Sequence, residues 1–130
     1  MLPFCRETGV GVIPWSPIAR GRLAKPRSST RDSSDAASSV RSQSDKKSDA
    51  WFADANPDII GAVEKVASKR GVSMALIATA WVLRQGCWPI VGVNSEERVR
   101  EAVQALRVEL SDEDCQSLEV GYKPRGIQGM

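Results

Sequence analysis

The sequence has no histidine, only three cysteines, and few aromatic residues: four tryptophans, two phenylalanines and one tyrosine in 130 residues. Without histidine, the chain by itself excludes a histidine-based catalytic triad or general base, and the usual zinc sites. Cys5, Cys87 and Cys115 lie far apart and follow no metal-ligand spacing. They indicate free, mostly buried thiols in a reducing compartment.

Strong charge and long apolar runs are also missing. The formal net charge of +2 is too small to indicate a nucleic-acid partner, and no basic stripe alternates with aromatics. No apolar run approaches the roughly 20 residues that span a bilayer. The first residues, MLPFCRETG, lack a basic segment followed by an apolar stretch, so no secretory signal is visible. The sequence therefore predicts a cytoplasmic protein without nucleic-acid or membrane partners.

Two short apolar runs are predicted to be buried strands. Residues 9–15 (GVGVIPW) and 88–92 (WPIVG) are each bounded by glycine and proline. Between them, residues 25–50 are rich in serine and mixed charge and offer almost nothing to bury. We interpret this segment as a disordered insertion.

Serine and asparagine mark the starts of four predicted helices. Asn56 and Pro57 supply a cap and a first-turn proline for a helix that ends before Gly71. Ser73 precedes MALIATAWVLRQ, which is apolar on nearly every face and so should be covered on more than one side. Ser95 begins a third helix with an apolar stripe on one side.

The last predicted helix starts at Ser111, where Asp114 completes a variant capping box, and it ends near Gly121. Strands separated by helical crossovers indicate a parallel sheet. Two parallel strands do not make a stable sheet, because each needs neighbours on its edges and cover on its faces. We therefore expect a piece of something larger, with Ile13 and Val91 uncovered and a tendency to self-associate or aggregate.

Two segments directly after the predicted strands carry the chemistry, since ligands bind at this edge of α/β sheets and barrels. Residues 15–23 (WSPIARGRL) offer a hydroxyl, loop amides, a glycine and two arginines, which together can hold a diphosphate. Residues 92–98 (GVNSEER) offer a helix start with a serine and an arginine, which can hold a phosphate. From the residues alone, a plain loop and an ordinary helix start remain open alternatives.

The combination of these motifs resembles the aldo-keto reductase family. VGVIPWSPIARGRL is similar to that family's seventh strand and following loop, commonly an aromatic residue before Ser-Pro-Leu-Ala-x-Gly. RGVSMALIATAWVLRQGCWPIVGVNSEERVREAVQAL is similar to its seventh helix, eighth strand and eighth helix, and SDEDCQSLE with GYKPR to its C-terminal helix and tail. Within this family, the sequence is similar in general character to fungal aryl-alcohol or secondary-metabolite reductases. It implies the last two strands of a (β/α)8 TIM barrel, and NADP(H) as cofactor.

The resemblance also implies roles for individual residues. Trp15 matches the aromatic residue that stacks on the nicotinamide, and Arg20 and Arg22 lie in the loop that wraps the diphosphate, with less defined roles. The other matching residues contact the diphosphate (Ser16, Pro17, Ile18, Gly21), the adenosine 2′-phosphate (Gly92, Val93, Asn94, Ser95, Arg98) or the adenine (Glu101, Ala102). Members commonly have asparagine where this chain has Ala102, which removes one hydrogen bond to adenine.

The family's catalytic residues have no match in this chain. Its hydride transfer to a carbonyl carbon uses a tyrosine acid tuned by a lysine, an aspartate and usually a histidine. All four belong to the first half of the barrel, and the single tyrosine here, Tyr122, lies near the C-terminus. The expected organisation is residues 1–24 as the end of helix six, strand seven and the cofactor loop, 25–50 as the insertion, and 51–130 as the remaining elements.

Two functional hypotheses follow from the resemblance. In the first, the chain is part of an oxidoreductase that acts on small carbonyl or alcohol substrates once the barrel is complete. In the second, it is a catalytically silent module that binds NADP or pairs with another barrel fragment.

Overall fold

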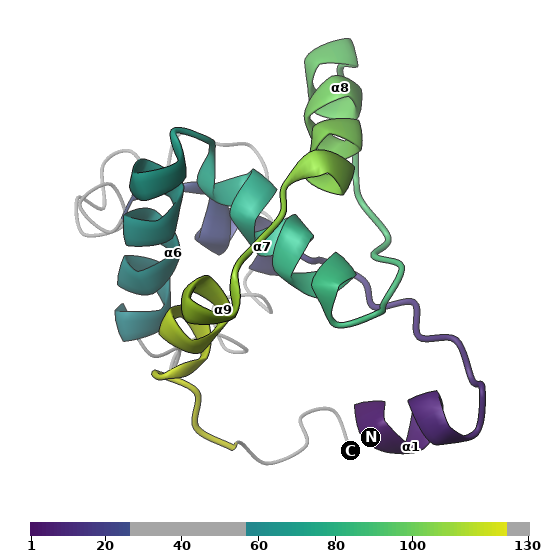
Figure 1. Cartoon of the computed structure of the whole chain (residues 1–130). Helices are drawn as coiled ribbons and strands as arrows, with labels where there is room; N and C mark the ends of the chain where they lie inside the picture. Colours follow the sequence, from purple (N-terminus) through teal and green to yellow (C-terminus); the bar gives the residue numbers. More distant parts are fainter. Residues whose placement is uncertain (27–56, 125–130) are drawn as a thin grey trace.

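The computed structural model describes residues 1–26 and 57–124, and these are mostly helical (Figure 1). The elements are α1 (Leu2–Glu7), the 3-10 segment η1 (Ala19–Ala24), α6 (Pro57–Arg70), α7 (Met74–Arg84), α8 (Glu96–Gln104), the 3-10 segment η2 (Ala105–Arg107) and α9 (Asp112–Glu119). The short α1 agrees with the resemblance of the first residues to the end of a helix. The predicted cap Asn56 and residues 27–50 of the predicted insertion lie outside the described residues.

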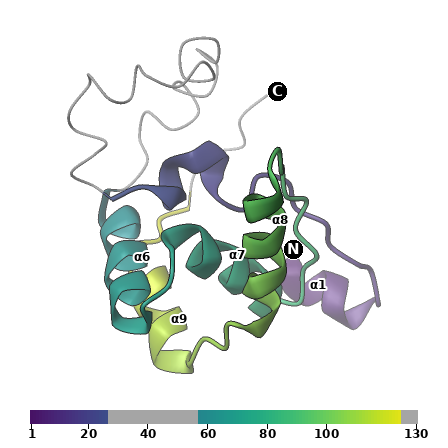
Figure 2. The ribbon, with the colours of Figure 1, turned by 90° about the horizontal axis from the view of Figure 1, so that it is seen from above.

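The central element is α7, which lies between α6 and α8 in both views (Figures 1 and 2). Its cap is the predicted one: the Ser73 hydroxyl accepts a hydrogen bond from the Leu76 backbone N–H at 3.2 Å. The helix packs against α6, α8, η1 and η2, and most of its first two turns is buried, with Ile77 fully buried. The prediction that so apolar a helix is covered on more than one side is confirmed.

The hydrophobic core lies where α6, α7 and α9 meet. It contains Val63, Val66, Ala67, Met74, Ile77, Ala80, Leu110 and Leu118. Full burial of an aliphatic side chain of this size contributes roughly 1.5–3 kcal/mol. Leu23 of η1 packs against this cluster, so the segment after the first predicted strand is anchored on the helices.

A buried carboxylate joins the end of α6 to the start of α9. The Asp114 side chain is 1% exposed and accepts hydrogen bonds from Lys69 Nζ at 3.3 Å, from Arg70 Nη2 and from the Ser111 backbone N–H at 3.2 Å. The Ser111 hydroxyl in turn accepts from the Asp114 backbone N–H, which completes the predicted capping box. Basic residues at a helix C-terminus thus meet acidic residues at a helix N-terminus, an arrangement that both helix dipoles favour.

The ionisation of Asp114 follows from these contacts. Burial works to raise the pKa of its carboxyl group. Hydrogen bonds from Arg70, from the Ser111 backbone and side chain and from Lys69 outweigh burial and hold that pKa well below its usual range. Asp114 is therefore charged in the folded chain at neutral pH.

In the described residues the two predicted strands are extended segments and not continuous strands. Their parallel pairing is nevertheless present at one bridge, between Trp15 and Ile90. The Trp88 backbone N–H donates to the Val12 carbonyl at 2.9 Å, and the Ile90 N–H donates to the Pro14 carbonyl at 2.8 Å. A pair without neighbouring strands has few hydrogen bonds to hold it in regular strand geometry, and Pro14 and Pro89 donate none.

One face of this strand pair is uncovered. Ile13, Trp15, Trp88 and Ile90 are 67%, 57%, 63% and 56% exposed, and we call these four residues the open face. They alternate with the less exposed Val12, Pro14 and Pro89, as expected for side chains that point to opposite faces. The prediction that Ile13 and Val91 lack cover is confirmed, with Val91 at 37% exposure the less exposed of the two.

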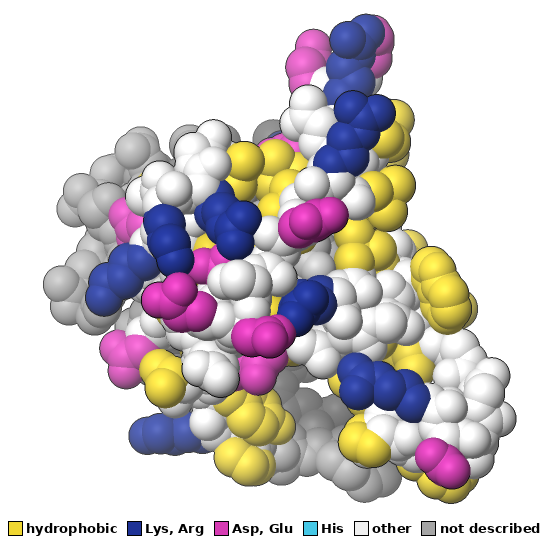
Figure 3. Space-filling view, in the orientation of Figure 1, with side chains coloured by type: hydrophobic (Ala, Val, Ile, Leu, Met, Phe, Trp, Pro, Cys, Tyr) yellow, Lys and Arg dark blue, Asp and Glu magenta, His cyan; other side chains and the backbone are white. Residues whose placement is uncertain are grey.

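The apolar stripe of α8 is uncovered as well. This helix buries none of its residues, and Val99, Val103 and Leu106 of the following η2 are 46%, 52% and 70% exposed. Figure 3 shows hydrophobic side chains along one side of α8 and below it. The stripe therefore extends the apolar surface of the molecule beyond the open face.

No single helix in residues 1–26 and 57–124 is long and apolar enough to cross a membrane. Asp58–Arg70 and Met74–Arg84 would pass that test only as a pair, and they are bent by 101° to one another. In this structure both helices contribute their apolar side chains to the core.

Candidate functional site

The parallel bridge brings the two predicted cofactor segments to one edge. Trp15 and Ile90 are paired, so the chain leaves the strand pair at Ser16 on one side and at Val91 on the other. Because parallel strands end at the same edge of a sheet, the loop after each strand starts beside the other. Segments separated by about 75 residues in sequence are thus adjacent where ligands bind in α/β proteins.

The first segment has an unusual backbone. Ser16, Ala19 and Arg20 have φ values of 55°, 48° and 56°, in the left-handed region that costs an L-residue roughly 1–2 kcal/mol. They are the only non-glycine residues with positive φ in the described parts of the chain. Gly21 follows with φ of 99°, which a residue with a side chain rarely adopts. Backbone strain of this kind clusters at ligand sites, although it does not name the ligand.

Hydrogen bonds within the segment hold this backbone in place. The Ala19 N–H donates to the Ser16 carbonyl at 2.9 Å, and the Gly21 and Leu23 N–H groups donate to the Ile18 carbonyl at 2.9 and 3.2 Å. Pro17 and Ile18 are half-buried within the same turn. The loop is therefore an ordered structure between the strand bridge at Trp15 and the core contact at Leu23.

The arginine predicted to lie near the diphosphate contacts the predicted nicotinamide-stacking residue. The guanidinium carbon of Arg20 lies 5.1 Å from the centre of the Trp15 ring, within the range of a cation–π interaction. Arg22 is half-buried one residue beyond Gly21. The sequence predicted a cationic loop here, but it held no signal for the contact between Arg20 and Trp15.

The second segment has the predicted helix start. Ser95 caps α8, and its hydroxyl accepts from the Arg98 backbone N–H at 3.4 Å. Gly92, Val93, Asn94 and the Arg98 side chain are exposed, so this surface is accessible. Hydrogen bonds from the Glu97 backbone N–H and from the Ser95 side chain lower the pKa of the Glu97 carboxyl group. A carboxylate of the chain itself thus uses donors at this helix start.

The two residues predicted to contact adenine lie further along α8 and are half-buried. The Glu101 carboxylate accepts a hydrogen bond from the Ser73 hydroxyl at the start of α7. Ala102 offers no polar group in the side chain. Glu101 therefore links α8 to the central helix, a role that the sequence pattern did not indicate.

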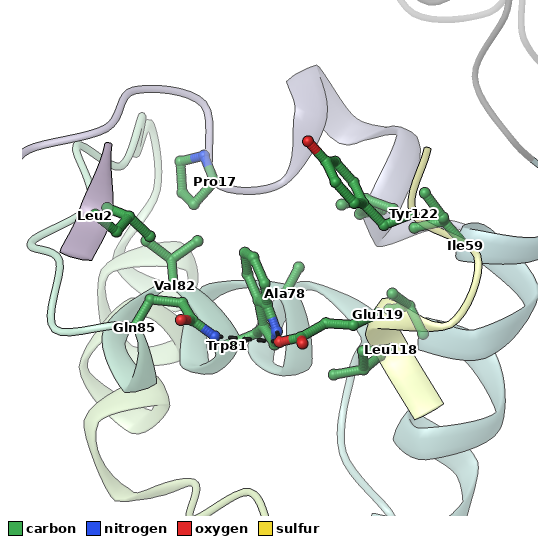
Figure 4. A pocket seen from close by; sticks show the side chains of 12 residues that line it. Leu2, Pro17, Ile59, Ala78, Trp81, Val82, Gln85, Leu118, Glu119 and Tyr122 are labelled. Atoms are coloured by element: carbon green, nitrogen blue, oxygen red, sulfur yellow. Dashed lines mark hydrogen bonds between the residues drawn. The ribbon is translucent and has the colours of Figure 1, made fainter. Parts of the chain in front are cut away.

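A separate apolar pocket of about 640 Å³ lies beside the first segment. Its lining includes Pro17, Leu23, Trp81 and Val82 of α7, and Tyr122, which follows α9. Figure 4 shows Pro17 and Tyr122 across the pocket from Trp81 and Val82. At its floor, Glu119 accepts hydrogen bonds from Trp81 Nε1 at 2.9 Å and from Gln85 Nε2 at 3.2 Å (Figure 4). Among the described residues that line this pocket with Tyr122 there is no lysine or aspartate, the two partners that tune the tyrosine acid in the resembled family.

Comparison with known proteins identifies the family to which the chain belongs. Residues 1–121 match the model of the aldo/keto reductase family. The chain is 44% identical over 130 residues to a Schizosaccharomyces pombe protein that carries the name of an aryl-alcohol dehydrogenase, covering 99% of this chain and 35% of that protein. It is 43% identical over 136 residues to the versiconal hemiacetal acetate reductase of Aspergillus parasiticus, covering 98% of this chain and 36% of the relative.

A similar Saccharomyces cerevisiae protein also carries the name of an aryl-alcohol dehydrogenase, with 40% identity over 129 residues, 96% of this chain and 35% of the relative. The chain thus spans about a third of the length of the relatives it matches. Because the family model covers nearly all of the chain, it decides the assignment. The chain belongs to the aldo/keto reductase family, in agreement with the resemblance of its motifs.

Proposed function

We propose that the chain is the cofactor-binding part of an NADPH-dependent reductase that interconverts carbonyl compounds and alcohols. In this proposal it supplies the last two strands of a (β/α)8 barrel together with their helices. The observation that carries the proposal is the parallel bridge between Trp15 and Ile90, which brings both predicted cofactor loops to one edge. The names of the similar proteins, an aryl-alcohol dehydrogenase and a hemiacetal acetate reductase, support this reaction class.

The residues at this edge fit a phosphorylated dinucleotide. Arg20 and Arg22 supply two cations in a loop with an ordered backbone, and the Ser16 hydroxyl lies at its start. The nine-residue helix α8 begins at the same edge, with Arg98 in its first turn. A helix N-terminus with a nearby cation stabilises a phosphate group. Trp15, on the open face, offers a ring on which the nicotinamide can stack.

Each group of residues has its own part in this mechanism. When bound, the reduced nicotinamide supplies the hydride that the reaction needs. The loop from Ser16 to Arg22 holds the diphosphate and so fixes the distance of the ring from the strand edge. Arg98 and the α8 start select the 2′-phosphate, since a cofactor without this group leaves their donors unused.

The acidic side chain of Glu97 lies in the first turn of α8, directly before Arg98. Its negative charge would repel a 2′-phosphate bound at this helix start. We therefore expect Glu97→Gln to bind NADPH more tightly than the unchanged chain.

Titration of the purified chain with NADPH and NADH tests the cofactor proposal. We expect NADPH to bind and Arg98→Gln to weaken NADPH about 5- to 20-fold, since a charge-assisted hydrogen bond is lost. The same variant should leave NADH affinity within about twofold, because NADH has no 2′-phosphate. An equal loss for both cofactors would contradict the assignment of Arg98, and no NADPH binding would contradict the proposal as a whole.

The same chain should not turn over substrate alone. Its single tyrosine lies in a pocket whose described lining residues include no lysine or aspartate that would tune it as an acid. Incubation with NADPH and aromatic aldehydes should leave the absorbance of the cofactor unchanged. Turnover by the isolated chain would show that an acid is present and would refute this part. The silent-module hypothesis predicts that no partner restores turnover.

We further propose that the open face and the α8 stripe are covered by the remaining strands of a barrel. The relatives have about two thirds of their length outside the match, enough for the other six strands of such a barrel. Parallel strands that add to both edges of the pair would satisfy the backbone groups at those edges, and closure of the sheet into a barrel would enclose Ile13 and Ile90. A second copy of the chain is the competing occupant.

Co-expression with the unmatched two thirds of the versiconal hemiacetal acetate reductase tests the occupant. We expect a soluble 1:1 complex that reduces aldehydes, and we expect Ile13→Lys with Ile90→Lys to abolish it. Ser68→Lys, at an exposed position of α6, is a control for an added cation and should leave the complex intact. A self-associated chain that ignores the added fragment would favour the second copy instead.

A further inference from the structure

The contact between Arg20 and Trp15 has a consequence for the redox state of the cofactor, and this consequence rests on the proposed function. We infer that Arg20 makes the site prefer the reduced dinucleotide over the oxidised one. The guanidinium lies 5.1 Å from the centre of the ring on which the nicotinamide is proposed to stack. Arg20 is therefore a specificity-determining residue and takes no part in the chemical step.

The backbone fixes this arrangement. Arg20 has φ of 56° and ψ of 29°, so the chain reverses within the loop and returns its side chain to Trp15, five residues earlier. One end of the loop is held by the bridge at Trp15 and the other by the core contact at Leu23. The guanidinium is thus held near the indole by an ordered turn.

Charge decides the direction of the preference. A ring stacked on an indole lies with its centre about 4.5–7 Å from the indole centre. The guanidinium and the nicotinamide then share one indole and lie within about 12 Å of one another. The oxidised nicotinamide ring carries a positive charge and the reduced ring is neutral, so only the oxidised ring is repelled.

The indole adds to this effect. A cation on an aromatic ring draws on the negative potential of its face, which a second cation would also use. An oxidised nicotinamide therefore gains less from stacking on Trp15 while Arg20 is there. The reduced ring stacks mainly through apolar contact and loses little. Both contributions favour retention of NADPH and release of NADP⁺.

The ratio of two affinities isolates this effect from phosphate binding. NADPH and NADP⁺ have the same diphosphate and the same 2′-phosphate, so losses at those groups cancel in the ratio Kd(NADP⁺)/Kd(NADPH). We expect Arg20→Gln to lower this ratio about 3- to 10-fold, the range for one charge at such a distance at a protein surface. Isothermal titration calorimetry measures both values without any turnover.

Two further variants control the experiment. Arg22→Gln removes an equal charge from the same loop, and we expect it to weaken both cofactors while it leaves the ratio unchanged. Arg20→Lys retains the charge and should retain most of the ratio, which separates charge from a change of loop structure. Far-UV circular dichroism shows whether each variant keeps the helical content.

The outcomes separate the two proposals. If Arg20→Gln binds both cofactors with the ratio of the unchanged chain, the inference about Arg20 is overturned and the cofactor site stands. A ratio that falls equally in Arg22→Gln overturns it as well, because any loop charge would then suffice. If the unchanged chain binds neither cofactor, the proposed function fails and the inference fails with it.

Discussion

The helical core buries its apolar residues, whereas the strand pair leaves its apolar residues exposed. In the core, Val66 and Ile77 of two crossed helices are 3% and 0% exposed, and a buried carboxylate fastens α6 to α9. On the open face, Ile13 and Trp88 are 67% and 63% exposed, and two backbone hydrogen bonds hold the pair. The core is closed by the chain itself, whereas the strand pair has the composition of an interior and the exposure of a surface.

This difference shows which part of the fold is stabilised by contacts within the described residues and which part lacks such contacts. The helices of the core, α6, α7 and α9, make their contacts within residues 57–119. A parallel strand needs a neighbour on each edge, and in a barrel such neighbours come from distant sequence. The candidate cofactor site lies at the strand pair. The proposed function therefore depends on the part of the structure with the fewest stabilising contacts.

The largest expected effect comes from a hole in the core. Ile77→Ala should lower the free energy of unfolding by about 2–5 kcal/mol, because a fully buried side chain leaves a cavity between α6 and α7. Val103→Ala, at a position that is 52% exposed, should change it by less than about 0.5 kcal/mol. Urea unfolding followed by circular dichroism at 222 nm (the helical signal) measures both. Equal effects would remove the distinction between the two regions.

A smaller effect is expected from the charge of Asp114. Asp114→Asn keeps the size of the side chain but removes the charge that Lys69 and Arg70 face, at an expected cost of about 1–3 kcal/mol at pH 7. Arg100→Gln, which breaks the exposed pair with Glu96, should cost less than about 0.5 kcal/mol.

The stabilising effect of the Asp114 charge should also depend on pH. The pKa of Asp114 is depressed in the folded chain, so its contribution is fully present above the unfolded value of about 3.9. The contribution is lost as the pH falls below that value toward the folded pKa. Between pH 5 and pH 2 the unchanged chain should therefore lose more stability than Asp114→Asn. Parallel pH profiles for the two chains would contradict the assignment.

The smallest expected difference concerns two serine caps of similar geometry. Ser73→Ala should cost about 1 kcal/mol, because it removes the cap of the central helix and its hydrogen bond to Glu101. Ser95→Ala removes a similar cap from α8, which buries no residue, so its effect on global unfolding should be only a few tenths of a kcal/mol. A larger loss at Ser95 would show that α8 is coupled to the core.

The sequence predicted local features better than distant contacts. Serine caps at positions 73, 95 and 111, the box completed by Asp114 and the central apolar helix all follow from residues a few positions apart. The parallel direction of the strand pair followed from the helical crossover. The predicted strands are present only as a single bridge, because strand propensity in isolated runs assumes neighbours that the described residues do not supply.

For the candidate site, the motif predicted which residues belong to the two loops but not how they contact one another. The positive φ values at Ser16, Ala19 and Arg20 have no sequence signal, since none of these residues is the glycine that such a backbone favours. The hydrogen bond between Ser73 and Glu101 and the stacking of Arg20 on Trp15 depend on how distant or reversed segments meet. Periodicity and capping rules describe single elements, so they do not predict contacts between elements.

If a dinucleotide contacts both loops as proposed, the bridge between Trp15 and Ile90 also makes it a cross-link. A ligand that contacts both loops binds only chains in which the strand pair is in register, so its apparent affinity is reduced by the fraction of chains without that register. By the same linkage, a concentration of 100 times the dissociation constant stabilises the paired state by about 2.7 kcal/mol. Cofactor concentration would then control how firmly the last strands are joined, and the ligand would act as a structural component of the edge it binds.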